Sequence, residues 1–230
     1  MTVLAETPQV QRGGSFQRSD QMWPMPAALR RVLLLVPPFL LASLEVLHPQ
    51  PDETPQALMD VATWFAGFHG IQLALTGLVG LSVLLLADDF GRASAWVTRL
   101  GVGIFLVFFS AYDAVAGIAT GLAMRNARDL TVAQQEGVFE VVKDWPGLGA
   151  PFVLSIIGTL GWVAAVGALA LAARRQGAPR REWVLIGLAA LFLLGGHPFP
   201  QGTLAFSCLF GAALLHELRL SRFDLASVTG

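Results

Sequence analysis

The chain has 230 residues, of which 54% are apolar and 13% are charged, and its formal net charge is −1. A soluble domain carries about 25% charged residues, so this composition excludes an ordinary water-soluble domain and predicts a membrane protein. No basic patch is interleaved with aromatic residues, and no nucleic acid is predicted as a partner. The single cysteine, Cys208, excludes an internal disulfide.

The predicted elements begin with a polar segment at residues 1–28, which is expected to be a flexible cytoplasmic tail ending in an interfacial anchor at Trp23. Segments long enough to be transmembrane helices follow, since about 20 helical residues cross the hydrocarbon core. Six are predicted, at residues 29–47, 62–87, 96–124, 149–173, 183–196 and 202–218. The predicted fold class is all-α, a polytopic membrane helical bundle over residues 29–218 with a cytoplasmic C-terminal tail at 219–230.

The last two apolar segments are short, and one interrupted helix over residues 183–218 is the alternative to two helices. The sequence Gly-Gly-His-Pro-Phe-Pro between them favours a turn. With two helices and the N-terminus inside, twelve of the 15 arginines and lysines fall on the inner side. This bias follows the positive-inside rule, so both termini are predicted to be cytoplasmic, in the plasma or inner membrane of the cell.

The outer loop at residues 130–145 has a helical pattern of its own. Leu130, Val138 and Trp145 belong to an apolar set that recurs at helical spacing, while Glu136 and Glu140 lie on the other face. The pattern predicts an amphipathic helix at the outer surface. This helix either packs on the bundle or moves as a lid.

Ionisable residues inside the apolar segments indicate a site, because each is costly in hydrocarbon. Three of the four histidines, His48, His69 and His197, are predicted on the outer side, and two of them begin a His-Pro-x-Pro sequence. Glu45 shares a helix face with His48, three residues away. Counted from the predicted outer ends, His69 lies about 7–8 Å deep and Asp113 about 15 Å deep, close to mid-membrane. The sequence thus predicts a polar pocket that opens outward and descends toward the centre.

Neighbouring polar residues extend the predicted pocket along two helices. His69, Gln72 and Thr76 occupy one face of the second segment, and Ser110 with Asp113 begins a stripe on the third. A central aspartate costs about 2.5–3.5 kcal/mol on insertion scales, so the two stripes are predicted to face each other. The predicted substrate-pocket residues are Gln72, Thr76, Ser110 and Tyr112.

Each polar residue also has a purely structural explanation. His48 and His197 can cap helices, since a histidine in the last turn donates to terminal carbonyls and the following proline ends the helix. Glu45 can pair with His48 at the interface. Asp113 can hydrogen-bond a neighbouring helix, and His69 can act as a polar clamp between helices.

Three functional classes follow from the same residues. The first is a membrane-embedded enzyme or metal protein, in which Asp113, Glu45 and His69 are the catalytic candidates. Imidazole and carboxylate ligands suit a divalent metal such as zinc, and facing histidines suit noncovalent haem. The candidate metal ligands are His48, His69, His197 and Glu45.

The second class is a proton-coupled carrier of a small solute or ion, with Glu45, His69 and Asp113 as the proton relay. The third is a structural or accessory subunit whose polar groups specify helix pairing. The predicted partners are the lipid bilayer and a small-molecule or lipid-like ligand. No lysine lies in a predicted span, which excludes a retinal Schiff base, and no P-loop or Gly-x-Ser-x-Gly sequence is present. The sequence leaves open whether the chain is an enzyme.

Overall fold

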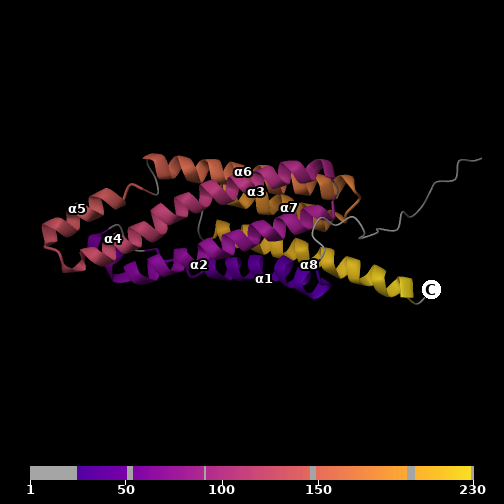
Figure 1. The fold of residues 1–230 in the computed structure, drawn as a ribbon, viewed down its shortest axis with the longest axis horizontal. Coiled ribbons are helices and arrows are strands. Elements are labelled where there is room, and N and C mark those ends of the chain that lie inside the picture. The colour runs from indigo at the N-terminus through magenta and orange to yellow at the C-terminus, as the bar shows by residue number, and fades with distance from the viewer. Residues whose placement is uncertain (1–24, 51–53, 91, 146–148, 196–199, 229–230) are drawn as a thin grey trace, which may run out of the picture.

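The structure of the chain, a computed structural model, describes residues 25–50, 54–90, 92–145, 149–195 and 200–228. All regular structure within these ranges is helical, and the helices run mainly along one long axis (Figure 1). In chain order the elements are α1 (Ala27–Glu45), α2 (Pro55–Asp88), α3 (Arg92–Asp113), the π-helical turn η2 (Ala114–Ala119), α4 (Thr120–Asn126), the 3₁₀ turn η3 (Ala127–Asp129), α5 (Val132–Val142), α6 (Gly149–Arg175), α7 (Arg180–Leu194) and α8 (Gln201–Val228). The predicted all-α fold class is confirmed.

Helices with the length and apolar composition of membrane spans account for most of the described chain. Five stretches qualify: Ala27–Glu45, Pro55–Asp88, Ala95–Asp129, Pro151–Arg175 and Gln201–Ser221. The remaining predicted segment is α7, whose 15 residues rise only about 22 Å. The chain is therefore a multi-pass membrane helical protein, while the count of six spans and the orientation stay predictions.

Large apolar side chains on the outside of the bundle fit this class. Trp96 is 71% exposed, Leu100 67% and Val107 65%, all on α3. Contiguous apolar surface of this kind is rare on soluble monomers and is typical of a surface that faces lipid or a partner. The buried side of the same helix carries Phe105 and Phe109, so α3 divides its apolar residues between the core and the surrounding lipid.

Small residues and one indole hold the middle helices together. A Cβ atom added to Gly101 of α3 would lie 2.6 Å from the carbonyl oxygen of Gly161 on α6, so only glycine permits this close helix approach. Trp162, the next residue of α6, is fully buried. Its indole N–H donates to the carbonyl of Ala189 at 2.9 Å, which ties α6 to α7.

One of the two prolines inside α1, Pro37, is accommodated by a neighbouring helix. Pro37 has no N–H, so the carbonyl of Leu33, four residues earlier, loses its usual helical donor. The hydroxyl of Ser82 on α2 donates to that carbonyl at 2.6 Å. The α1–α2 pair is therefore joined by a hydrogen bond that replaces the one the proline removes.

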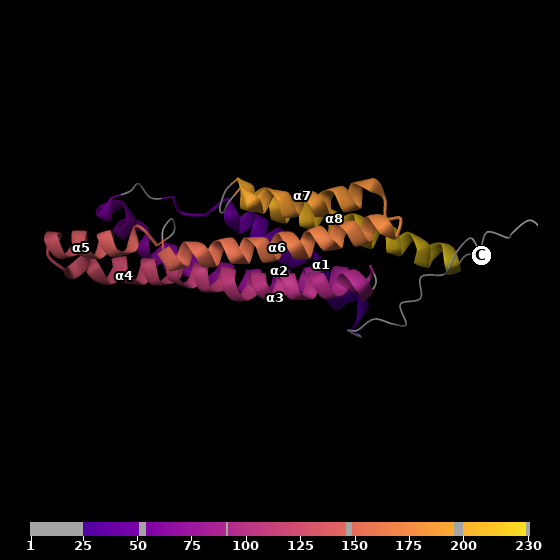
Figure 2. The same cartoon turned by 90° about the horizontal axis from the view of Figure 1, so that it is seen from above.

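The end of the molecule away from the C-terminus is a small lobe built from the start of α2, α4 and α5 (Figure 2). A capping box of Thr131 and Gln134 begins α5, within the segment predicted as an amphipathic helix at 130–145. Phe139 and Val142 of α5 point inward and are buried. The core of the lobe comprises Leu58, Met59, Ala62, Met124, Phe139 and Val142. Contact of α5 with the outer leaflet stays a prediction.

The two ends of the chain differ in part from the prediction. Residues 1–24 lie outside the described residues, so most of the predicted tail at 1–28 is not described, and α1 already begins at Ala27. At the other end, α8 continues to Val228, through most of the segment predicted as a tail at 219–230. Residues 219–228 contain no proline or glycine, so nothing local ends the helix there.

Candidate functional site

Helix α2 presents one polar face to the interior of the bundle. His69 is 4% exposed, Gln72 1% and Thr76 3%, and the three lie on successive turns of one side. This confirms that the polar stripe on the second apolar segment faces inward. Two residues of this face, His69 and Gln72, contact polar residues from elsewhere in the chain. We call the resulting group the His69 cluster and define it as Glu45, His48, His69, Gln72 and Asp113.

Glu45 lies at the last residue of α1 and is completely buried. The side-chain amide of Gln72 donates to its Oε1 atom at 2.9 Å. A Cβ atom added to Gly202 of α8 would lie 2.6 Å from Glu45 Oε2, so the glycine makes room for the carboxylate. Glu45 is therefore enclosed where the ends of α1 and α8 meet the middle of α2.

His69 makes the central contacts of the cluster. Its Nδ1 atom lies 2.7 Å from the carbonyl oxygen of Phe65, and its Nε2 atom lies 3.2 Å from Nε2 of His48. The Asp113 carboxylate is slightly farther, with Oδ1 at 3.8 Å from His69 Nε2. The predicted meeting of polar residues from the first three apolar segments is thus present in the fold.

The contact with Phe65 determines which nitrogen of His69 carries a proton. A backbone carbonyl only accepts hydrogen bonds, so Nδ1 of His69 is the donor. In the neutral ring Nε2 is then the basic nitrogen, and it faces His48 and Asp113. His69 is therefore oriented to accept a proton, or a metal ion, on the side where the other two residues lie.

The helix that carries Asp113 changes its winding immediately after it. The π-helical turn η2 begins at Ala114, and such single-turn insertions are frequent at functional sites. Gly117 within this turn lies against His69, because an added Cβ atom would be 2.2 Å from the imidazole Cγ. The histidine ring occupies the space that a side chain at Gly117 would fill.

Aromatic rings surround the two histidines. The His48 ring centroid lies 4.9 Å from that of Phe68, and the His69 centroid lies 4.5 Å from that of Phe65. His48 itself is only partly buried, whereas His69 and Asp113 are buried. Proton or ion binding here would take place in surroundings of low dielectric constant, where electrostatic interactions are strong.

The other predicted site residues fall at different places. Thr76 lies on the inward face of α2, two turns from His69, and Ser110 and Tyr112 are partly buried on α3. The Tyr112 ring packs beside Phe109, with centroids 6.0 Å apart. His197 lies outside the described residues. The roles of these residues stay predictions.

The predicted depth of Asp113 in the membrane stays a prediction. The side chains of His48 and Asp113 both approach Nε2 of His69, and His48 lies just beyond the end of α1. Beyond Asp113, η2 and α4 pack beside α2.

No group of three or more His, Cys, Asp and Glu side chains that could hold a metal ion occurs within the described ranges. Of the predicted metal ligands, His48 and His69 bring their Nε2 atoms together, while Glu45 accepts a hydrogen bond from Gln72. A metal set that includes His197 is not tested, because that residue lies outside the described part of the chain.

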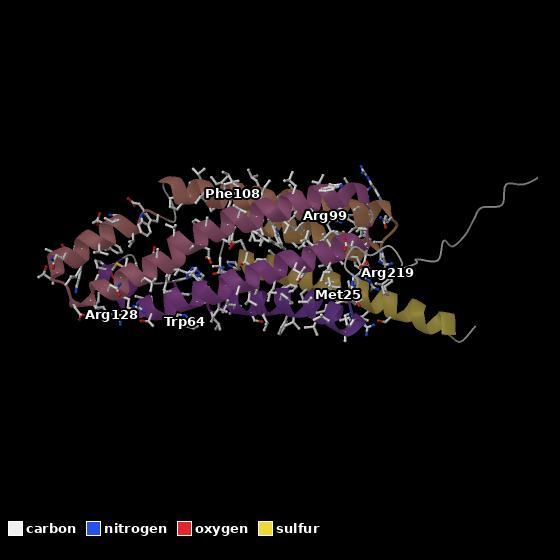
Figure 3. All side chains as sticks on the ribbon, viewed as in Figure 1. Met25, Trp64, Arg99, Phe108, Arg128 and Arg219 are labelled. Carbon is white, nitrogen blue, oxygen red and sulfur yellow. The ribbon has the colours of Figure 1, made fainter. Side chains whose placement is uncertain are left out.

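A second polar cluster lies at the other end of the bundle and was not predicted. We call it the His216 cluster. Its members come from the starts of α1 and α7, the end of α2 and the interior of α8: Arg30, Arg31, Asp89, Glu182, His216, Glu217 and Arg219. Figure 3 shows Arg219 near this end and Arg128 near the opposite end. In the sequence, His216 is the one histidine that is not predicted on the outer side.

Alternating charges connect the His216 cluster. Arg30 bonds to Asp89 and, at 2.5 Å, to Glu217. His216 bonds to Asp89 through Nε2 at 2.8 Å. Arg219 holds Glu182 with two contacts, at 2.9 and 3.1 Å.

The His216 cluster also sets the protonation of Glu182, which lies at the start of α7. Burial favours the neutral carboxylic acid, but hydrogen bonds and charge from His216 in its protonated form and from Arg219 outweigh burial and hold the pKa of Glu182 below its usual value. Glu182 is therefore a carboxylate at neutral pH. In the sequence, Glu182, His216 and Arg219 lie near the ends of apolar segments, as charged residues at a membrane interface ordinarily do. Their positions therefore did not indicate a buried cluster.

Comparison of the chain with protein-family models, with curated proteins and with solved structures gave no match. The class of the protein rests on its fold and composition. It is a multi-pass α-helical membrane protein with two polar clusters, one toward each end of its bundle.

Proposed function

We propose that this membrane protein exchanges protons at the His69 cluster and couples this exchange to the passage of a small solute. The observation that carries the proposal is the arrangement around His69. Its Nδ1–H is held by the Phe65 carbonyl, so its basic Nε2 faces His48 at 3.2 Å and Asp113 at 3.8 Å. Ionisable residues that face a bundle interior commonly mark proton relays in pumps and transporters.

In this proposal a proton arrives at His48, the partly exposed member of the cluster. It passes to Nε2 of His69, and the resulting imidazolium is stabilised by the Asp113 carboxylate. Gln72 lies one helical turn from His69 on α2 and donates a hydrogen bond to Glu45 of α1. Glu45 is therefore the second carboxylate that can respond to this charge. A solute whose binding favours one protonation state would then move together with the proton.

The proposed orientation follows from the arginines and lysines. We place both termini in the cytoplasm and the His69 cluster toward the outer side of the cell membrane, because this arrangement puts most basic residues inside. The short helix α7 is proposed as the sixth span, paired with α8. A solute from outside would then meet His48 before the buried members of the cluster.

A metal-binding enzyme is the second candidate, and one distance favours it. Two nitrogen ligands at 2.0–2.1 Å from a tetrahedral zinc ion are about 3.3 Å apart, close to the 3.2 Å between the Nε2 atoms of His48 and His69. Ligating histidines also commonly donate their other N–H to a carbonyl, as His69 does to Phe65. The described residues supply no third ligand, so this candidate requires His197, which lies outside them. Haem between these two rings fits less well, because the rings contact each other directly.

The test uses the full chain in vesicles that carry an internal pH dye and a potassium diffusion potential. Proton flux is measured alone and with mixtures of amino acids, organic acids and sugars. We expect Asp113→Asn and His69→Gln each to lower the solute-dependent flux by about tenfold or more. Asp129→Asn makes the same change at an exposed position and should leave the flux unchanged.

Metal analysis of the purified protein separates the two candidates. Stoichiometric zinc that is lost in His48→Gln and His69→Gln would favour the metal enzyme. If the protein contains no metal and shows no proton flux, and all variants fold normally, helix pairing is the remaining role for these polar groups.

A further inference from the structure

The His216 cluster has a balanced set of fixed charges. Three arginines, Arg30, Arg31 and Arg219, stand against three carboxylates, Asp89, Glu182 and Glu217. Arg31 and Arg219 form its exposed ends, with side chains 48% and 30% exposed. His216 is 2% exposed and is the one member whose charge ordinarily changes near neutral pH.

The contacts of His216 indicate its tautomer. Arginine only donates hydrogen bonds, and Nη2 of Arg219 lies 3.0 Å from Nδ1 of His216, so Nδ1 is the acceptor. Nε2 therefore carries the proton and donates to Asp89 Oδ2 at 2.8 Å. The ring in this arrangement is neutral.

A protonated ring has a second arrangement available at the same place. Oε2 of Glu182 lies 3.5 Å from Nδ1 of His216, on the side where Arg219 also binds. If Nδ1 gains a proton, it repels the Arg219 donor and attracts the Glu182 carboxylate. Two alternative partners for one nitrogen, one for each charge state, are the requirement for a proton-operated switch.

We propose that Nδ1 of His216 is a second proton-binding site, which Arg219 covers in the neutral state and uncovers when the proton arrives. The proton comes from water at the Arg219 end of the cluster and adds to the lone pair of Nδ1. The Arg219 N–H···Nδ1 hydrogen bond breaks, and an Nδ1–H···Oε2 hydrogen bond to Glu182 forms. Arg219 remains paired with Glu182 or turns toward solvent. The inference goes beyond the proposed function and stands without it.

All the helices packed around His216 contribute to its charge environment. Asp89 at the end of α2 faces Nε2, Glu182 of α7 faces Nδ1, and Arg219 belongs to α8 itself. Arg30 of α1 faces the far side of Asp89 and neutralises part of its charge. The Phe90 ring covers the remaining face, with its centroid 5.0 Å from that of His216.

The two histidine sites are separated by a bilayer-like distance. His69 lies on α2, and Asp89, the Nε2 partner of His216, follows the last residue of the same helix. The step of 20 positions from His69 to Asp89 rises about 30 Å, which matches the thickness of the hydrocarbon core, about 30 Å. A proton site at His216 would therefore serve the opposite membrane face from the His69 cluster.

The test is a histidine-selective ¹⁵N NMR titration of the full chain in detergent or nanodiscs. The chain has four histidines, and the spectrum of His216→Gln assigns the His216 signals by difference. We expect the Nε2–H tautomer at alkaline pH and a doubly protonated ring in acid, with the transition between about pH 5 and 8. The titration itself is measured on the wild-type chain, and His216→Gln serves only to assign the signals.

Two variants test the exchange of partners. Glu182→Gln should weaken proton binding at His216 by about tenfold, and Arg219→Gln should strengthen it by about tenfold. Arg175→Gln removes an exposed arginine at the end of α6 and should change it by less than about threefold. An Nδ1–H tautomer, or a ring that stays neutral down to about pH 4.5, would overturn the proposal, as would equal responses of Arg219→Gln and Arg175→Gln. The His69 signals, assigned with His69→Gln, report the proposed function separately.

Discussion

The contact between Gly117 and His69 gives the sharpest prediction for the proposed site. Gly117→Ala adds a Cβ atom only 2.2 Å from the imidazole Cγ, whereas ordinary contact begins at 3.4 Å. The ring must therefore move by roughly 1.2 Å or more. A displacement of this size is enough to break the 3.2 Å contact between the Nε2 atoms of His69 and His48.

The magnitude follows from three contributions to the free energy of unfolding. Overpacking a close contact costs about 1–3 kcal/mol, and losing the hydrogen bond costs about 1 kcal/mol. Replacing glycine in a helix by alanine gains about 1 kcal/mol. We therefore expect Gly117→Ala to destabilise the protein by about 1–3 kcal/mol.

Gly103→Ala is the matched control for this prediction. Gly103 is exposed on α3 and has nothing within 4 Å of an added Cβ atom. Gly103→Ala should therefore raise the free energy of unfolding by up to about 1 kcal/mol. Both free energies of unfolding are measured by denaturant titration in mixed micelles. Equal stability of Gly117→Ala and Gly103→Ala would refute the placement of His69 against η2.

Two further predictions concern the cluster charges and the topology. Arg30→Ala should lose about 3–5 kcal/mol of stability in the same assay, because it removes the buried guanidinium that pairs with both Asp89 and Glu217. The half-exposed Arg31→Ala should lose less than about 1 kcal/mol; similar losses would mean that Arg30 is not buried in the cluster. In a Cys208→Ala background, cysteines at the exposed positions Gln50 and Gln176 should react with an impermeant reagent from opposite sides of the membrane. Labelling of both from the same side would contradict the proposed orientation.

The apolar segments of the sequence were sufficient to predict the helices and the inward polar face of α2. His69 and Gln72 could be assigned to the interior because a polar stripe on a membrane helix is costly toward lipid. The pairing of His69 with Asp113 followed from the same argument applied to the third segment. The packing of η2 and α4 beside α2 could not be predicted, because the length of a helix does not say how far its neighbours extend beside it.

The His216 cluster was missed for a related reason. In the sequence, Arg30 and Arg219 are basic residues at the inner ends of apolar segments, and the positive-inside rule treats them as topology signals. Nothing local distinguishes an arginine that faces water from one that reaches a carboxylate on another helix. The burial of Asp89 and His216 becomes visible only when the helix ends are brought together.

The sequence alone determined that this is a helical membrane protein with titratable side chains inside its apolar segments, because hydropathy and helical periodicity are local properties. The tertiary structure decided which of these side chains meet. His48 reaches His69, and Arg219 reaches His216 and Glu182, through the packing of helices from distant parts of the chain. Hydrogen-bond partners depend on distances of a few tenths of an ångström, and only the packed bundle sets such distances.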